Sequence, residues 1–187
     1  VARDTMDNIM IDMETLGVSV SSPIISIAAA FFETDGSVGK TFYRVVDLKS
    51  ALSHGQVEPS TLAWWMSQSD EARKIFSDPS ATSLDRVLQD LDAFIKGEGN
   101  SENVKVWGNG PYFDNAILAQ AYKNIDASLP WRFRNDRDVR TIVDLAKCLK
   151  NIDPLKLAVR EGVHHNALSD ALYQIECVSI AYRALKG

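Results

Sequence analysis

The stretch NIMIDMETLG, residues 8–17, is typical of a buried strand that ends in acidic side chains. Three apolar residues precede Asp12, and because side chains alternate along a strand, Asp12 and Glu14 project from the same face. Two like charges about 6–7 Å apart at the end of an apolar strand are costly unless a cation neutralises them. Hard carboxylate oxygens of this kind suit Mg²⁺ or Mn²⁺. The pattern indicates either a metal site or a solvated strand end.

Further strands and helices around this stretch predict a mixed sheet. Residues 23–33 form a second apolar strand, residues 34–37 have hairpin turn chemistry, and residues 40–46 alternate like a third strand, which suggests an antiparallel meander. Two short helices are expected within 59–76, longer ones over 83–96, 112–123 and about 166–185, and strands at 104–107 and 138–142, the last running into a helix to residue 149. This order favours one α/β domain in which a sheet of about five strands is flanked by helices.

The helix expected over residues 83–96 has the clearest helical period. Its apolar residues recur three and four positions apart, at Leu84, Val87, Leu88, Leu91 and Ile95.

Composition excludes several classes of protein. The chain has 187 residues, 45% of them hydrophobic and 24% charged, which is an ordinary globular mixture and not that of a disordered chain or a disulfide scaffold. The 25 acids and 20 bases give a formal charge of −5. This acid excess argues against a protein that coats duplex nucleic acid by bulk electrostatics. Met6 resembles a natural start, so residues 1–5 are expected to be a tail outside a domain spanning residues 6–187.

The cysteines and the apolar runs indicate a cytoplasmic protein. Cys148 and Cys177 are expected to be buried thiols in a reducing cytosol. The longest apolar run, residues 23–32, is far shorter than the roughly 18 residues of a membrane span. No membrane association is therefore expected.

The segment VWGNGPYFD, residues 106–114, is a strand, a glycine-containing turn and the start of a helix. Asp114 falls in the first helical turn, where an acid also favours the helix dipole without any further role. Gly108 and Gly110 allow a backbone or a ligand to approach closely. The segment is neither a P-loop nor a dinucleotide-binding fingerprint.

The segment HHNALSDA, residues 164–171, opens the last predicted helix. Asn166 is a plausible N-cap, which places Asp170 inside the helix and His165 in the preceding loop. A capping or surface role for His165 and a dipole-favourable role for Asp170 are the alternatives. His54 and His164 are expected to have no special role.

Together, the three segments resemble the DEDDh (DnaQ-like) 3′–5′ exonucleases from Met6 to the C-terminus. The runs DMETLG (12–17), WGNGPYFD (107–114) and HNALSDA (165–171) match the three exonuclease motifs of that family in order. Trp64-Trp65 and the run NDRDVRT (135–141) look like small phage and prophage exonuclease VIII-like enzymes. The resemblance implies an RNase H-like fold and a 3′–5′ exonuclease.

The resemblance also implies a two-metal mechanism. Two divalent cations, Mg²⁺ or Mn²⁺, can clamp the attacking and leaving oxygens of an in-line phosphoryl displacement. By resemblance, Asp12 bridges both cations, Glu14 and Asp170 complete one shell, and Asp114 holds the other. His165 takes the proton of the attacking water, for which an unperturbed pKa near 6.5 is suitable. The product would be a nucleoside 5′-monophosphate.

The expected substrate is nucleic acid with a free 3′ end, single-stranded DNA or RNA. By resemblance, its terminal nucleotide contacts Met13, Thr15, Leu16, Gly17 and Asn109, with Leu16 wedged against the base and Phe113 as a stacking platform. Trp64 and Trp65 are candidates for base stacking, with the alternative that at least one of them belongs to the core. Asp138 and Arg140 are expected to be structural, or to support the metal ligands without binding the cations themselves.

Charge is unevenly distributed along the chain. Residues 131–160 hold eight bases and four acids, a local +4 that is compatible with a strand-guiding groove or with a solvated helix face. A non-enzymatic nucleic-acid-binding module and an RNase H-type endonuclease are the alternative functions. Many relatives are dimers, which suggests a homodimer.

Overall fold

A computed structural model describes residues 6–98, 102–110, 112–162 and 165–187. The expectations for residues 1–5 and for His164 fall outside these ranges. Five strands form one sheet in the order β3-β2-β1-β4-β5. They are β1 (Asn8–Thr15), β2 (Ile24–Phe32), β3 (Val38–Val45), β4 (Lys105–Gly108) and β5 (Asp136–Asp138). β1, β2 and β3 pair antiparallel, whereas β4 pairs parallel with β1 and β5. The expected meander and the mixed sheet of about five strands are confirmed.

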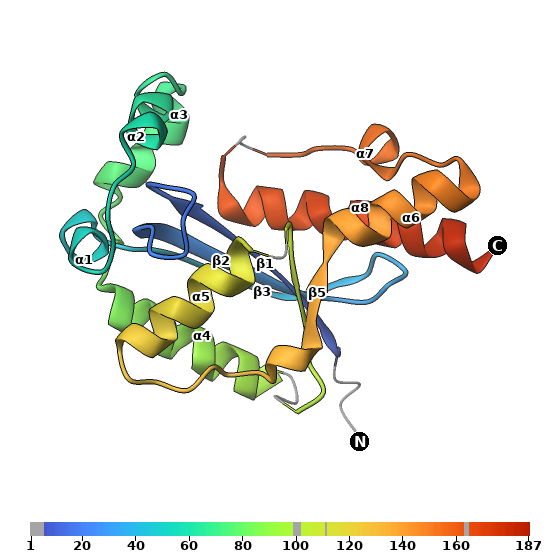
Figure 1. Cartoon of the computed structure of the whole chain (residues 1–187), viewed down its shortest axis with the longest axis horizontal. Helices are drawn as coiled ribbons and strands as arrows, with labels where there is room; N and C mark the ends of the chain where they lie inside the picture. Colours follow the sequence, from blue (N-terminus) through green and yellow to red (C-terminus); the bar gives the residue numbers. More distant parts are fainter. Residues whose placement is uncertain (1–5, 99–101, 111, 163–164) are drawn as a thin grey trace.

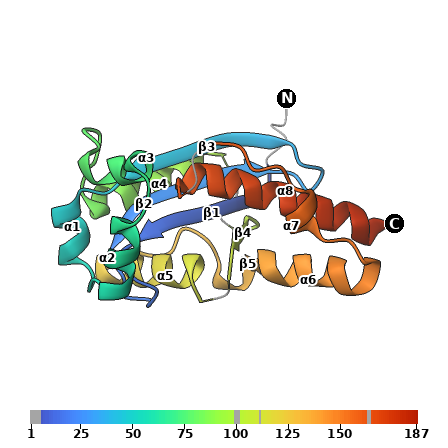
Figure 2. The same ribbon diagram turned by 90° about the horizontal axis from the view of Figure 1, so that it is seen from above.

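Helices cover both faces of the sheet, with α4 and α5 on one side and α6 and α8 on the other (Figure 1). The view from above shows α8 running along the sheet (Figure 2). The helices are α1 (Leu48–Ser53), α2 (Pro59–Met66), α3 (Asp70–Arg73), α4 (Leu84–Glu98), α5 (Asp114–Asn124), α6 (Val139–Lys150), α7 (Pro154–Leu157) and α8 (Ala167–Lys186), with 3₁₀ turns η1 (Lys74–Ser77) and η2 (Phe133–Asn135).

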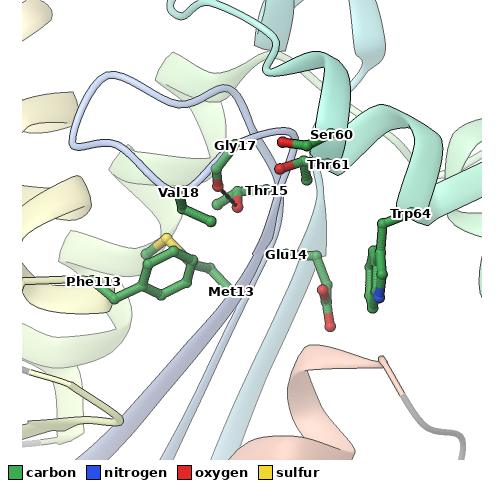
Figure 3. A pocket seen from close by; sticks show the side chains of 9 residues that line it. All are labelled: Met13, Glu14, Thr15, Gly17, Val18, Ser60, Thr61, Trp64 and Phe113. Atoms are coloured by element: carbon green, nitrogen blue, oxygen red, sulfur yellow. Dashed lines mark hydrogen bonds between the residues drawn. The ribbon is translucent and has the colours of Figure 1, made fainter.

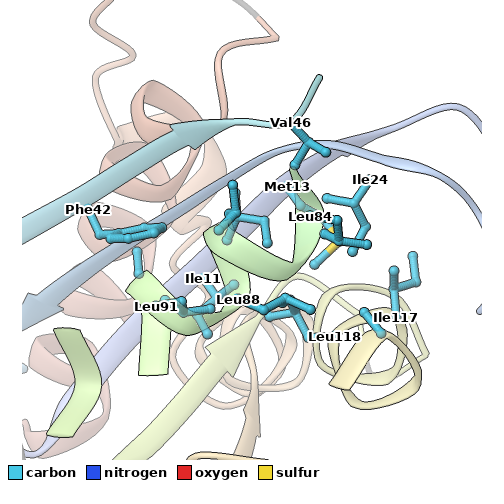
Figure 4. Close-up of a cluster of buried hydrophobic side chains, with 14 of the residues drawn as sticks. Ile11, Met13, Ile24, Phe42, Val46, Leu84, Leu88, Leu91, Ile117 and Leu118 are labelled. Carbon is cyan, nitrogen blue, oxygen red and sulfur yellow. The ribbon is translucent and has the colours of Figure 1, made fainter. Parts of the chain in front are cut away.

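Alternation along β1 divides the core and positions the acids. Ile9, Ile11 and Met13 pack toward α4 and α5, whereas Met10 packs toward α6 and α8. Asp12 and Glu14 follow Met10 at intervals of two, so they face α8. On the α4 side, the buried residues of that helix are the predicted apolar stripe, which packs on β1, β3 and α5 (Figure 4).

The boundary between β5 and α6 differs from the prediction. The strand ends at Asp138, and residues 139–142 are helical, because the Asp138 carboxylate accepts hydrogen bonds from the backbone N–H groups of Arg140 and Thr141. This N-cap begins α6 and lets the helix bury Val139 and Val143. The structural role expected for Asp138 is this cap.

Two short helices, α1 and α7, were not predicted, and the predicted burial of one cysteine was wrong. α1 and α7 begin at Asp47 and Asp153, whose side chains cap them, and both helices are too short to show a period in the sequence. Both cysteines are free, but only Cys177 is buried, while Cys148 is exposed on α6 beside Asp144. Its helix buries other positions, Val139, Val143 and Ala146, against the sheet and α8.

Candidate active site

Asp12 and Glu14 lie at the end of β1, on the face covered by α8. Gln174 of α8 donates a hydrogen bond from Nε2 to Oδ1 of Asp12 over 2.7 Å. The other amide atom of Gln174, Oε1, is buried without a hydrogen-bond partner among the described residues. The glutamine therefore orients Asp12, whose carboxyl group is close enough to Asp114, Glu14 and Asp170 for their charges to act on it.

Asp114 reaches this cluster from the first turn of α5. Its side chain is buried, at 1% exposure, and Oδ2 accepts a hydrogen bond of 3.0 Å from the backbone N–H of Asn109. Oδ1 is buried without a hydrogen-bond partner in the part of the chain that is described. Gly108 permits this approach, because a Cβ there would lie 3.2 Å from Cβ of Asp114 and would clash with Asn115.

Asp170 and His165 come from the start of α8. Asn166 caps the helix by accepting a hydrogen bond from the backbone N–H of Ser169, as predicted, and His165 precedes the cap with a φ of +62°. One ligand atom from each of Glu14, His165 and Asp170 lies within 4.8 Å of the others. Arg160 forms an ion pair with Asp170. The left-handed backbone of His165 thus turns its side chain into the acidic cluster.

Burial and mutual repulsion favour the protonated forms of the Asp12, Glu14 and Asp114 carboxyl groups. Burial raises the pKa of Asp12 well above its usual range, and the charges of Asp114 and Glu14 raise it further. Burial and the Asp170 carboxylate raise the pKa of Glu14 to about 8. Burial raises the pKa of Asp114 to about 6, against the lowering effect of the Asn109 backbone N–H. These groups can all ionise at neutral pH only when positive charge is brought among them.

The residues present are suited to divalent cations. Four carboxylates converge, and one of them has a buried oxygen, Oδ1 of Asp114, with no hydrogen-bond partner among the described residues. A buried carboxylate with one oxygen left without a partner is unfavourable in a protein, and carboxylate oxygens are the preferred ligands of Mg²⁺ and Mn²⁺. The donor set therefore fits a divalent metal centre.

A pocket of about 390 Å³ opens beside Glu14, a volume within the roughly 300–1,000 Å³ of small-ligand sites. Met13 and Phe113 form one wall and Trp64 stands on the opposite side, with Glu14 between them (Figure 3). The remaining lining residues are Thr15, Gly17, Val18, Ser60 and Thr61. Five of the residues predicted to contact substrate therefore line one cavity next to the acids, namely Met13, Thr15, Gly17, Trp64 and Phe113.

Leu16 and Trp65 require a correction. Leu16 is 2% exposed and Trp65 is 1% exposed, and both belong to the hydrophobic core. Core packing leaves neither side chain a surface for stacking on a base. Trp64, in contrast, is 40% exposed and contacts the His165 ring edge-on, with ring centroids 4.6 Å apart. Of the tryptophan pair, the first lines the pocket and the second holds the core, which was the alternative left open.

Helix α2 is tied to the end of β1 and carries the far wall of the pocket. Nε1 of Trp65 donates a hydrogen bond of 2.9 Å to the carbonyl of Thr15. The Glu58 carboxylate accepts hydrogen bonds from the backbone N–H groups of Val18 and Ser19, at 2.9 and 3.1 Å. Glu58, Ser60 and Thr61 were not singled out in the sequence, where only the proline at the start of α2 marks this segment.

Asn109 and Arg140 lie close to Asp114 but do not line the pocket beside Glu14. Arg140 donates a hydrogen bond from Nε to Oδ1 of Asn109 over 3.3 Å, and its charge lowers the pKa of Asp114. Asn109 lines a second pocket with α6 and does not line the one beside Glu14. Gln174 was not predicted as a site residue, and Arg140 was expected to be structural or to support the metal ligands. The contacts of both side chains join positions far apart in the chain.

None of the helices in the described ranges is long and apolar enough to cross a membrane.

Comparison with known proteins gives sequence matches over almost the whole chain. A family model described as the 3′-5′ exoribonuclease Rv2179c-like domain matches residues 7–182. An exodeoxyribonuclease of Enterobacteria phage T4 is 27% identical over 208 residues, which cover 97% of this chain and 92% of the relative.

Solved structures share the fold at low sequence identity. The nuclease domain of 3′hExo, described as a DEDDh family member bound to rAMP, matches with a TM-score of 0.67 and 11% identity over 98% of this chain and 94% of that one. The Mg²⁺- and Mn²⁺-bound form of S. pombe Pop2p matches with a TM-score of 0.61 and 16% identity over 94% and 82% of the two chains. The sheet and its flanking helices thus form the RNase H-like fold of the DEDDh exonucleases.

Proposed function

Because the chain belongs to the family of Rv2179c-like 3′-5′ exoribonuclease domains and is a metal-dependent 3′–5′ exonuclease of the DEDDh type, we propose that it removes nucleotides one at a time from single-stranded 3′ ends with two divalent cations. The observation that carries the proposal is the convergence of four carboxylates and His165 beside a nucleotide-sized pocket. Residues 6–187 act as one exonuclease domain.

Asp12, Glu14, Asp114 and Asp170 hold the cations, which are Mg²⁺ or Mn²⁺. When bound, two such cations stabilise the attacking and leaving oxygens of an in-line displacement at phosphorus. The protein's contribution is a rigid arrangement: Gln174 orients Asp12, the Asn109 backbone N–H orients Asp114, and the Asn166 cap fixes the turn of helix that carries Asp170.

His165 accepts the proton of the water that attacks the terminal phosphodiester. Its position at the junction of the loop and α8 brings a ring nitrogen close to the carboxylates of Glu14 and Asp170. The Trp64 ring packs against the imidazole and limits its orientations. A base held in this way favours attack from one direction only.

The pocket beside Glu14 receives the 3′-terminal nucleotide. Phe113 and Trp64 offer aromatic surfaces on opposite sides, which suit a base of any sequence, because every base has a π-face. Hydrolysis at the phosphate of this nucleotide releases a nucleoside 5′-monophosphate and leaves a new 3′ end.

The proposed substrates include both DNA and RNA. The family is described as exoribonucleases, whereas the phage T4 relative is named as an exodeoxyribonuclease. Proteins distinguish the two sugars through contacts to the 2′-hydroxyl. The pocket is also lined by Ser60 and Thr61, whose hydroxyl groups could make such contacts, whereas the Thr15 hydroxyl already donates to the Gly17 carbonyl.

The test compares 5′-labelled DNA and RNA oligomers, single-stranded or with a duplex end, incubated with Mn²⁺. We expect ladders that shorten from the 3′ end in steps of one nucleotide, a loss of this activity in Asp12→Ala, and normal activity in the control Asp70→Asn, whose side chain is exposed on α3. Full-length label that persists equally with wild type and Asp12→Ala would contradict the proposal. Cleavage of a circular oligomer would instead support the RNase H-type endonuclease.

A homodimer stays a prediction. Sedimentation equilibrium of the full chain measures the mass of the particle directly.

A further inference from the structure

A second pocket, of about 450 Å³, lies on the other side of Asp114 from the terminal-nucleotide pocket. It is formed by Asn109, by α6 and by Leu155 of α7. The loop before α5 connects the two cavities: Phe113 lines the first and Asn109 lines the second, while Asp114 follows Phe113 directly. Asp114 therefore adjoins a residue of each pocket, Phe113 in the chain and Asn109 by a hydrogen bond, and the proposed function assigns an occupant to only one of the two pockets.

Arg140 stands at the end of the second pocket nearest the carboxylates. Its guanidinium packs beside Gly110, where a Cβ would come within 3.4 Å of Cζ, and its Nε contacts Asn109. Within the described ranges, Arg140 has no carboxylate at ion-pair distance and its side chain is exposed. An exposed guanidinium without an anionic partner, next to a phosphodiester-cleaving site, is well placed to bind a phosphate.

The remaining walls combine a second cation with an apolar floor. Lys147 lies two turns after Arg140 on the same face of α6, is 38% exposed and pairs with Asp153 over 3.1 Å. Val139, Val143 and Leu155 supply apolar surface. Asp144 also lines the pocket, so its side chains carry a net charge of +1. Cations beside an apolar surface match the two parts of a nucleotide, its phosphate and its base.

We propose that this pocket binds the nucleotide on the 5′ side of the scissile phosphodiester, with its phosphate at Arg140 and Lys147 and its base or sugar against Val143 and Leu155. The inference rests on the proposed exonuclease function. The strand then spans the carboxylate cluster, with its last nucleotide beside Phe113 and the preceding one beside α6. In this proposal, part of the basic segment over residues 131–160 guides the strand, which was one of the two alternatives for this segment in the sequence.

The test compares two substrates that carry the same terminal nucleotide and attacked phosphorus but differ in the leaving group, which is the upstream strand in one and p-nitrophenolate in the other. One is a single-stranded oligonucleotide, and the other is the p-nitrophenyl ester of thymidine or uridine 5′-monophosphate, which has no upstream nucleotide. We expect Arg140→Gln to lower the ratio of kcat/KM for the oligonucleotide to kcat/KM for the ester about tenfold, the effect of one lost charge-assisted contact. Lys147→Gln lowers the same ratio by a smaller factor, because Lys147 is already paired with Asp153.

The ratio of the two kcat/KM values cancels any effect of a variant on the binding of the terminal nucleotide or on the attack of water, because both substrates depend on these. Arg86→Gln on α4 and Lys123→Gln on α5 remove exposed cations outside the pocket and leave the ratio unchanged. The dependence of log(kcat/KM) for the oligonucleotide on log[salt] becomes shallower by about one for Arg140→Gln, as for one lost phosphate contact.

A neutral methylphosphonate in place of the phosphodiester next upstream of the scissile one identifies the contact. It lowers kcat/KM of wild type and has little further effect in Arg140→Gln, because the same charge pair is already lost. Ratios equal to that of wild type in both variants would overturn the inference, as would a methylphosphonate effect of equal size in wild type and Arg140→Gln. A wild-type protein that hydrolyses neither substrate would overturn the proposed function itself.

Discussion

At the scale of single residues, the site contains carboxyl groups with raised pKa values and a histidine with an unusual backbone conformation. Asp114 is buried and Asp12 and Glu14 are partly buried, and this partial removal from solvent raises the pKa of each carboxyl group above its ordinary value. His165 has a left-handed backbone that few non-glycine residues adopt. Such strain and repulsion are tolerated where a site requires them.

Replacing His165 tests its assignment as a base. We expect His165→Ala to lower kcat by about 10²- to 10⁴-fold, the usual contribution of general base catalysis, and to leave Mn²⁺ affinity close to that of wild type. Calorimetric titration with Mn²⁺ and single-turnover hydrolysis measure the two effects. His54→Ala is the control, because His54 contacts Asp85 on α4. Loss of Mn²⁺ affinity in parallel with activity would make His165 a metal ligand instead.

At the scale of elements, α2 positions the pocket wall through contacts with the end of β1. Glu58 holds the loop after β1 by two backbone N–H groups, and Trp65 holds the Thr15 carbonyl. The same helix presents Ser60, Thr61 and Trp64 to the pocket. The distance between α2 and β1 therefore sets the width of the pocket beside Glu14.

Releasing this loop should affect substrate binding more than chemistry. We expect Glu58→Ala to raise KM for single-stranded oligomers about 5- to 100-fold, as for about 1–3 kcal/mol from two backbone groups left without their charged acceptor, and to change kcat less. Steady-state kinetics give both values. Glu71→Ala, on the neighbouring α3, should leave both unchanged. A fall in kcat with an unaltered KM would show that the loop does not shape the pocket.

The core helix α4 provides a test of the fold. Leu88 lies at the centre of the predicted stripe and is fully buried, so Leu88→Ala should lower the free energy of unfolding by about 2–5 kcal/mol. Gln89→Ala, on the exposed side, should change it by less than about 0.5 kcal/mol. Urea denaturation followed by circular dichroism measures both. Equal effects of the two substitutions would contradict the assignment of this face to the core.

Much of the fold was predictable because apolar residues recur in its strands and helices with a clear strand or helix period. The alternation of β1 and the stripe of α4 follow directly from which residues are apolar. The start of α6 was missed because an aspartate that caps a helix also ends the preceding strand. The three acidic segments could be found in the sequence, but not Gln174 or Glu58, nor the contact of Arg140 with Asn109, because these contacts exist only once the chain is folded.

At the scale of the whole molecule, the acidic cluster should make metal-free stability depend on pH. The folded-state pKa values of Glu14 and Asp114, about 8 and 6, lie above their ordinary values of 4.5 and 3.8. Groups with raised folded-state pKa values contribute stability at low pH, and this contribution is lost as pH rises through the folded-state values.

We therefore expect Tm in EDTA to fall as pH rises from about 4 to about 8, and Mn²⁺ to reduce or abolish the fall, because it binds the ionised folded protein. Thermal unfolding at a series of pH values measures both. Glu14→Gln should show a smaller decrease, whereas the exposed Asp70→Asn should match wild type. A metal-free Tm that stays constant or rises over this range would contradict the electrostatic description of the site.

The most direct test of the account is calorimetric titration of Mn²⁺ into the full chain at pH 7, repeated in two buffers of different ionisation enthalpy. We expect saturable binding that releases protons, because Glu14, with a pKa of about 8, is largely protonated before the cation enters. Asp114→Asn should bind Mn²⁺ more weakly or with a lower stoichiometry. Absence of Mn²⁺ binding, or the same affinity, stoichiometry and proton release in Asp114→Asn as in wild type, would contradict a catalytic metal centre at these carboxylates.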